Sequence, residues 1–282
     1  MPAAAFVSTA LTRTLVAHAE GCGLAVERLL TRAGIDPAWL EGHGKVPARL
    51  VEQLLVECES AGAGREFGCE LVPGMATHSL QGLNILLDSA ATVRASLECF
   101  IRYLPLVTNC VLVSLEEDAG QTLLHVRRYQ HQPHYYMLDA AVLSLVRNIA
   151  RRAGKPPASV FTQVTLLAQQ AAQPWLQEWG VPTAEGQWLC LQLAPGALAL
   201  ALPGANGFLH QSMLRQWQGA VGDADRQGSL QLARHWLAAG DQPIERIAAR
   251  LGYRQPSNFI RAFRKQFGVT PKQFRLGVLQ SA

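Results

Sequence analysis

The feature that most constrains the fold is a pair of short helical patterns near the C-terminus, separated by a glycine. In the first pattern, four apolar residues recur at the spacing of a helix that buries one face: Ile244, Ile247, Ala248 and Leu251. Pro243 stands at a plausible first helical position, and Gly252 breaks the pattern. The run 255–257 restarts a helix that continues to Phe267 and closes at Gly268. The sequence therefore predicts two short helices joined by a tight turn.

The second of these helices has two chemically different faces when its residues are placed at about 100° per residue. Its apolar side is mainly aromatic and consists of Phe259, Ile260, Phe263 and Phe267. Its opposite side is basic and rich in hydrogen-bonding groups: Ser257, Asn258, Arg261, Arg264 and Lys265. Binding in the DNA major groove requires such a helix after a short turn, because Arg can pair with guanine and Asn with adenine. A helical hairpin with solvated charges is the alternative interpretation.

The charge of the chain is divided unevenly between its parts. Residues 226–282 contain ten Lys or Arg and two acids, a net charge of +8, whereas the rest contains 15 basic and 19 acidic residues, a net charge of −4. A basic C-terminal part on an acidic body indicates a polyanionic partner for that part alone. On charge alone, a solvated basic face without a partner is an equally good interpretation.

A further helical stretch, residues 229–239, precedes the helix pair and ends at Gly240. Its apolar side consists of Leu232, Trp236 and Leu237. Before it, residues 219–228 are polar and rich in glycine, which is typical of a linker. We therefore expect a body at residues 1–210, a linker at 211–228 and a small all-α domain at 229–282.

The C-terminal residues resemble the second helix-turn-helix of the AraC/XylS transcription regulators. The motifs that carry this resemblance are Ile247-Ala248, Leu251-Gly252-Tyr253, Ser257-Asn258-Phe259, Arg261-Ala262-Phe263, Gly268-Val269-Thr270-Pro271 and Phe274-Arg275. The resemblance implies a regulator of transcription that binds double-stranded DNA, with RNA polymerase as a further partner. It implies no cofactor.

The resemblance and the two faces of the helix together assign candidate DNA contacts. We expect Asn258 and Arg261 to contact bases, with support from Gln255. The side chains expected to hold phosphates are Arg254, Ser257, Arg264 and Lys265. The phenylalanines of the apolar side are expected to be structural and to pack the helix against the core of the domain.

The body of the chain is more weakly similar to the effector-binding domain of one branch of the same family, the arabinose-binding-like branch. The similarity rests on Gly34-Ile-Asp-Pro37, Val46-Pro47 and the run 80–106. It implies a domain that senses a small-molecule effector and forms a homodimer. Effector binding would then change how the two DNA-binding domains of the dimer lie relative to each other, through the segment 219–228.

The chain departs from the family at one point. Family members usually carry two helix-turn-helix units, but only 22 residues lie between Asn206 and Ser229, too few for the first unit. We therefore expect one helix-turn-helix per subunit. The alternative function is an interaction protein that pairs with a full-length relative and inhibits it, with little DNA binding of its own.

The body predicts an α+β fold. The first hundred residues have helical patterns, and strand-like runs follow at 110–115, 122–129, 160–167 and 188–193, with Glu116 to Gly120 as a polar hairpin loop. Helices are expected at 136–152, 174–180 and 197–202, and a further one at 208–217. This order indicates one mainly antiparallel sheet with helices, followed by the all-α helix-turn-helix domain.

Four residues are candidates for binding the effector: His78, Gln81, Tyr103 and Arg127. The polar segment 78–82 precedes an apolar helix and could bind an anionic or polar group, although a simple helix cap is the alternative. Tyr103 belongs, with Tyr129, Tyr135 and Tyr136, to a group of aromatics that could line a pocket or form core.

Several classes of site have weak or no support in the sequence. His131 and His134 have the spacing of a metal-binding pair, but no Cys or acid nearby completes a set, so we expect no metal. The six cysteines form no C-x-x-C pair and predict free thiols. Asp88 and Asp139 are isolated carboxylates, and without a catalytic constellation we expect no enzyme.

The start lacks a signal peptide pattern, and no apolar run approaches the roughly 18 residues of a membrane helix. These features predict a cytoplasmic protein without a membrane partner.

Overall fold

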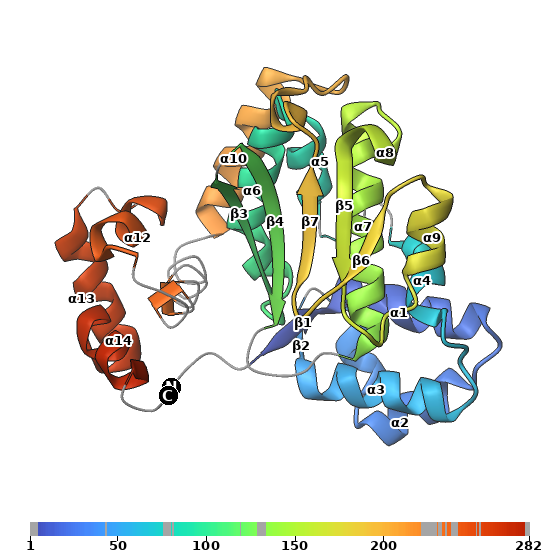
Figure 1. The fold of residues 1–282 in the computed structure, drawn as a ribbon. Helices are drawn as coiled ribbons and strands as arrows, with labels where there is room; N and C mark the ends of the chain where they lie inside the picture. The colour runs from blue at the N-terminus through green and yellow to red at the C-terminus, as the bar shows by residue number, and fades with distance from the viewer. Residues whose placement is uncertain are drawn as a thin grey trace. The chain divides into compact units, whose positions relative to one another are not determined.

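The structure is a computed structural model that describes residues 5–42, 44–75, 80, 82–118, 120–128, 134–220, 230, 233–234, 236–237, 242–251, 253 and 255–279. Within it the chain divides into two compact units, residues 5–217 and the part from residue 218 onward (Figure 1). Each unit is described by itself.

The N-terminal unit begins with a layer of helices and a short strand pair. Strands β1 (Phe6–Ser8) and β2 (Lys45–Pro47) pair antiparallel. The helices of this half are α1 (Thr9–Gly21), α2 (Val26–Ala33), η1 (Pro37–Leu40), α3 (Ala48–Ser60), α4 (Phe67–Glu70), η2 (Val72–Gly74), α5 (Leu83–Asp88) and α6 (Val93–Val107). The Ser8 side chain caps the start of α1, and Gly34 ends α2 in the left-handed conformation, with φ 72°.

The second half of this unit is a five-stranded sheet with order β3-β4-β7-β5-β6. Its strands are β3 (Val111–Asp118), β4 (Gln121–Arg128), β5 (Phe161–Leu166), β6 (Thr183–Glu185) and β7 (Leu189–Leu193). All neighbours pair antiparallel except β5 and β6, which are parallel. The remaining helices are α7 (Tyr135–Ala153), α8 (Pro157–Val160), α9 (Gln173–Glu178), η3 (Ala197–Ala199) and α10 (Gly207–Ala220). The predicted α+β class with a mainly antiparallel sheet is confirmed.

One face of the sheet packs on helices α6 and α7 (Figure 1). The other face carries polar side chains such as His125 and Arg127. On β4, Leu124 and Val126 are buried, whereas Arg127 belongs to the opposite face and is half-buried. Strand β7 repeats this alternation, because its leucines are buried and Cys190 and Gln192 are half-buried.

Helix α7 is fixed to its surroundings by a close backbone contact and by a buried carboxylate. A Cβ atom on Gly68 of α4 would lie 2.2 Å from the carbonyl oxygen of Tyr136, so the two helices can approach this closely only with glycine at that position. Asp139 is fully buried and accepts hydrogen bonds from the backbone N–H groups of Ala171 and Ala172 at 3.1–3.2 Å. Burial raises the pKa of Asp139 to about 6, although these hydrogen bonds oppose the shift.

Two boundaries differ from the sequence prediction. The predicted loop 116–120 is mostly strand, because β3 runs to Asp118, which pairs with Gln121 across a short turn with Gly120 at φ 80°. Acidic residues fit there because the end of β3 is exposed, and Glu117 forms an ion pair of 2.7 Å with Arg94. In addition, helix α10 continues to Ala220, so residues 211–220 of the predicted linker are helical. The rest of that linker lies outside the described residues.

The C-terminal unit contains helices α12 (Ile244–Arg250), α13 (Pro256–Phe267) and α14 (Pro271–Leu279). Its core consists of Leu230, Ala233, Leu237, Ile247, Ala248, Phe259 and Phe263. Residues 230, 233–234 and 236–237 are helical, as expected for the stretch 229–239. Helix α13 starts after Gln255 and ends at Gly268 with φ 78°, where the sequence predicts both ends.

Candidate functional site

Helix α13 has an exposed polar face and a buried aromatic face, as the helical wheel predicts. Phe259 and Phe263 have no exposed surface, and Ile260 and Phe267 are partly buried. The side chains on the other face are all exposed: Ser257, Asn258, Arg261, Arg264 and Lys265. Gln255, at the start of the helix, is exposed as well. Arg254 lies outside the described residues.

The aromatic floor of α13 is closely packed around Phe263. Its ring centroid lies 4.5 Å from that of Phe267, 5.7 Å from Phe259 and 5.9 Å from Phe274. The guanidinium of Arg234 lies over the rings of Phe267 and Phe274, at 5.9 and 5.6 Å. This packing fixes the rotation of α13 about its axis and therefore the direction of its basic face.

Helix α14 is held next to α13 by a capping box. The hydroxyl of Thr270 accepts a hydrogen bond from the N–H of Gln273 at 3.3 Å, and the Gln273 side chain accepts one from the N–H of Thr270 at 2.9 Å. Arg275 of α14 donates to the carbonyl of Gln242, just before α12. The three helices are therefore tied together by side chains as well as by the core.

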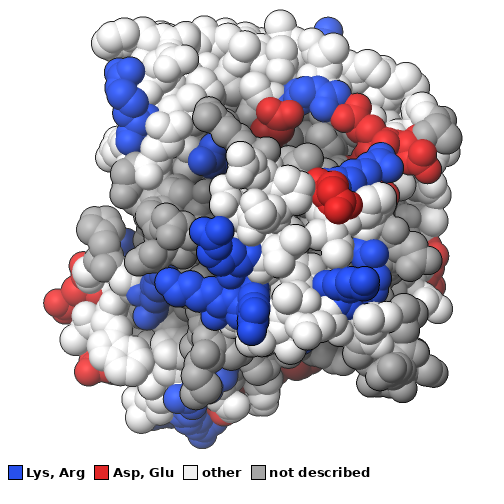
Figure 2. Space-filling model, turned by 90° about the vertical axis from the view of Figure 1, so that its left-hand side faces the viewer, with Lys and Arg blue, Asp and Glu red and all other residues white. Residues whose placement is uncertain are grey.

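In the space-filling view of Figure 2, Lys and Arg side chains gather on part of the visible face. Among the described residues of the C-terminal unit, Arg261, Arg264 and Lys265 are exposed cations on α13. A helix with exposed cations, an amide and a hydroxyl on one face can contact both phosphates and base edges.

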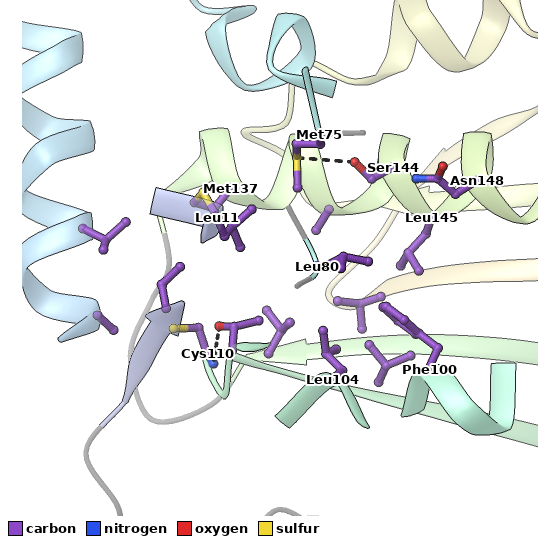
Figure 3. Close-up of a pocket in the computed structure, with 18 of the residues that line it drawn as sticks. Leu11, Met75, Leu80, Phe100, Leu104, Cys110, Met137, Ser144, Leu145 and Asn148 are labelled. Atoms are coloured by element: carbon purple, nitrogen blue, oxygen red, sulfur yellow. Dashed lines mark hydrogen bonds between the residues drawn. The ribbon is translucent and has the colours of Figure 1, made fainter. Parts of the chain in front are cut away.

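The N-terminal unit contains a cavity of about 120 Å³ (Figure 3). Its walls come from β1, α1, α3, α6, β3, β4 and α7, and most lining side chains are aliphatic, aromatic or thioether. Representative residues are Leu11, Leu55, Leu97, Phe100, Leu104 and Met137. Helix α7 contributes one stripe at helical spacing: Met137, Ala141, Ser144, Leu145, Asn148, Ile149 and Arg152.

The polar side chains of the cavity wall differ in the strength of the hydrogen bonds that they already make. Arg152 is almost fully buried and donates to Asp88 at 2.6 Å and to Asn84 at 2.7 Å. Thr108 donates to the carbonyl of Phe6 at 3.1 Å. Ser144 donates to the sulfur of Met75 at 3.5 Å, which is a weak interaction.

Two of the four predicted effector-binding residues, Tyr103 and Arg127, do not line this cavity. Tyr103 is fully buried and packs against Trp217, with ring centroids 5.7 Å apart, and it does not line the cavity. Arg127 also does not line it, because it lies on the face of β4 opposite to the cavity-lining Val126. His78 and Gln81 lie outside the described residues, although Leu80 between them lines the cavity. Sequence reasoning missed the stripe on α7, whose apolar spacing is also that of an ordinary core helix.

The histidines and tyrosines that precede and begin α7 have structural contacts. His134 caps the helix and lies 3.2 Å from Glu59, which also accepts a hydrogen bond of 2.7 Å from the hydroxyl of Tyr135. Tyr136 is buried and donates to the carbonyl of Ala63 at 3.0 Å. Tyr129 and His131 lie outside the described residues.

One group of potential metal ligands occurs among the described residues. The ligand atoms of His18, Cys22 and Glu70 lie within 4.8 Å of one another. However, Nε2 of His18 is 3.1 Å from the carbonyl oxygen of Phe67. If Nε2 donates to this carbonyl, it is protonated, and only Nδ1 of His18 keeps a lone pair for a metal.

Two further predictions concern free thiols and membrane-spanning helices. All six cysteines are free, and burial raises the pKa of the Cys58 thiol to about 11 and that of Cys69 to about 12. In the part of the chain that the structure describes, none of the helices has the length and apolar character needed to cross a membrane.

Comparison with known proteins gives two family matches. Residues 226–277 match the helix-turn-helix domain family, and residues 23–176, more than half of the chain, match the family described as the arabinose-binding domain of AraC transcription regulator, N-terminal. Both matches agree with the resemblance that the sequence motifs predict, including a single helix-turn-helix match.

Two individual proteins are also similar to the chain. A segment of 44 residues, 16% of this chain, is 43% identical to the uncharacterised HTH-type transcriptional regulator YtdP of Bacillus subtilis (strain 168), and it covers 6% of that protein. The crystal structure of the transcriptional regulator CdpR from Pseudomonas aeruginosa is similar with a TM-score of 0.47 and 16% identity, over 89% of this chain and 96% of CdpR.

Proposed function

The chain belongs to the AraC family of transcription regulators, and we propose that it binds double-stranded DNA as a homodimer whose DNA affinity responds to a small molecule bound in the N-terminal unit. Each subunit presents one α13 to the major groove. RNA polymerase is included as a partner on the basis of the family resemblance. The alternative, an inhibitor of a full-length relative with little DNA binding, is not favoured.

The observation that carries the DNA-binding proposal is the separation of faces on α13. Two phenylalanines without exposed surface anchor the helix, and every hydrogen-bonding and cationic side chain predicted for DNA contact and described by the structure is exposed. Asn258 and Arg261 lie one helical turn apart, so both can reach base edges in one groove. Arg264 and Lys265 flank them and suit phosphates.

The proposed dimer follows from the small size of the DNA-binding unit. One short recognition module contacts few phosphates and bases, and its affinity is expected near the non-specific range of roughly 10⁻⁴–10⁻⁶ M. A second linked module can raise the overall affinity by about 10²–10⁴-fold when both half-sites are spaced correctly. Half-sites about one helical turn apart are therefore expected.

The proposed effector site is the cavity of the N-terminal unit. It is enclosed by α7, α6 and α3 together with the sheet, so a bound molecule would contact elements that are distant in sequence. A ligand that binds one arrangement of these elements more tightly shifts the equilibrium between DNA-binding and non-binding dimers.

The proposal is tested by comparing two substitutions on α13 on specific and random DNA. Arg261→Ala is expected to cost about 1–3 kcal/mol on a specific site and much less on random DNA, because it removes a base contact. Lys265→Ala is expected to weaken binding to specific and random DNA alike. It should also reduce the slope of log affinity against log salt concentration by about one.

Arg28→Ala serves as the matched control, since Arg28 is an exposed cation on α2 of the other unit and its loss changes the net charge equally. Fluorescence anisotropy titrations at several salt concentrations provide the measurement. If all three variants bind specific and random DNA as wild type does, α13 is not the DNA-binding surface.

A further inference from the structure

The size and chemistry of the cavity limit what the N-terminal unit can bind. Its volume of about 120 Å³ is close to that of engineered apolar cavities, roughly 150 Å³, which stay dry and bind benzene. Apolar side chains make up most of the wall, and Leu11, Leu104, Phe100 and Leu145 are among those labelled in Figure 3. A compact apolar ligand therefore fits this space. Such a ligand has no hydrogen bonds to water that it would lose on entering a cavity whose walls offer few partners.

The charged groups of the wall do not favour a charged ligand. Among the described lining residues, Arg152 is the cation, and its Nε and Nη2 already donate to Asp88 and Asn84. Glu52 is the acid among these described residues, and it would repel a carboxylate. A ligand carboxylate would thus enter without a partner of its own, at a high cost in desolvation.

Two neutral polar side chains lie next to each other on α7. Ser144 and Asn148 are one helical turn apart and both face the cavity in Figure 3. The Ser144 hydroxyl has the weak sulfur acceptor of Met75, and the Asn148 amide makes no hydrogen bond with the residues that the structure describes. They can together satisfy one hydroxyl or carbonyl group of a ligand.

From these observations we infer that the effector is an uncharged, compact apolar molecule with a single hydrogen-bonding group, held by Ser144 and Asn148. This inference rests on the proposed function, since it assigns the chemistry of the proposed effector site. It departs from the description of the matched N-terminal family as arabinose-binding. A pentose has a hydroxyl on nearly every carbon, and most of these would be buried against Leu, Val and Phe side chains without partners.

Isothermal titration of the full-length protein with four probes tests the inference. Phenol and n-hexanol are the neutral apolar probes, sodium hexanoate is the charged probe of equal length, and L-arabinose is the sugar. Phenol and n-hexanol are expected to bind, with n-hexanol at least tenfold tighter than hexanoate and with arabinose showing no saturable heat. Toluene is expected to bind more weakly than phenol, and Asn148→Ala is expected to reduce this preference.

A cavity-filling variant assigns the binding to this site. Ala141→Leu adds three carbons to the wall on α7 and is expected to lower the affinity for n-hexanol at least tenfold. Ala38→Leu, the same change at an exposed position in η1, is expected to leave it unchanged. Circular dichroism and thermal unfolding of both variants verify that they are folded.

The outcomes separate this inference from the proposed function. If arabinose or hexanoate binds at least as tightly as n-hexanol, and Ala141→Leu abolishes that binding, the inferred ligand chemistry is wrong while the effector site stands. If neither neutral probe binds, or if Ala141→Leu binds n-hexanol as wild type does, the inference is also overturned. Failure of the wild-type protein to bind DNA in a parallel anisotropy titration would refute the proposed function instead, whatever the probes do.

Discussion

Truncation of Phe263 to alanine is expected to unfold the DNA-binding unit while sparing the rest of the protein. The Phe263 side chain is fully buried, and three aromatic rings lie within 5.9 Å of its own, centroid to centroid. Removing such a ring typically costs about 3–5 kcal/mol. A domain the size of the matched segment 226–277 has a total stability of about 3–8 kcal/mol, at roughly 0.05–0.15 kcal/mol per residue. The substitution thus removes from about two fifths to all of that stability.

Differential scanning calorimetry and DNA-binding titrations of the full chain measure this effect. Two unfolding transitions are expected for the wild type, and Phe263→Ala should lower or abolish only the one that belongs to the C-terminal unit, together with DNA binding. Phe208→Ala is the control, because Phe208 is 83% exposed and its loss should move neither transition by more than a degree or two. Equal effects of the two substitutions, or unchanged DNA affinity in Phe263→Ala, would refute the assignment of Phe263 to the floor of the recognition helix.

Three further predictions concern the stability of single positions. Gly68→Ala should destabilise the N-terminal unit by about 1–3 kcal/mol or more in urea unfolding, because the new Cβ would lie 2.2 Å from the Tyr136 carbonyl oxygen. Gly64→Ala is the control and should be nearly neutral, because a Cβ at Gly64 would have no atom within 4 Å. Thr270→Ala should lower the stability of the C-terminal unit by about 1 kcal/mol through loss of the capping box, and no change in its unfolding temperature would contradict that role. The pKa of Asp139 is raised from 3.8 to about 6, so the native state binds the Asp139 proton more tightly than the unfolded chain does. The stability that this proton contributes is full below pH 4 and is lost as the pH rises through 6, by on the order of 3 kcal/mol. Asp139→Asn should remove this slope between pH 4 and 6, and an unchanged slope would show that other groups cause it.

The C-terminal unit could be predicted from sequence because its signals are local. The ends of α13 are marked by Pro256 and Gly268, and its two faces follow from residues three and four positions apart. The motifs of the helix-turn-helix lie within one short segment, so the family resemblance could be recognised there. The contacts with DNA remain predictions from residue chemistry.

The cavity could not be predicted because its walls come from segments far apart in the sequence. Val7 of β1 and Ile149 of α7 both line it, and each belongs to a pattern that is equally typical of ordinary core. The sequence also gave no sign of the β1–β2 pair, whose strands are three residues long and whose partners, such as Phe6 and Pro47, are separated by about forty positions. Arg127 is an effector-binding candidate from sequence, but strand alternation points it away from the cavity that Val126 lines.

The central claim is that a homodimer binds DNA through one α13 from each subunit, and in vitro selection tests it most directly. The full-length protein is incubated with random double-stranded DNA, and the bound sequences are amplified and read after several rounds. The account predicts enrichment of a short motif that occurs twice per molecule, with centres about 10–10.5 base pairs or a multiple apart. Recovery of no motif, or of a single copy without a fixed second half-site, would contradict it.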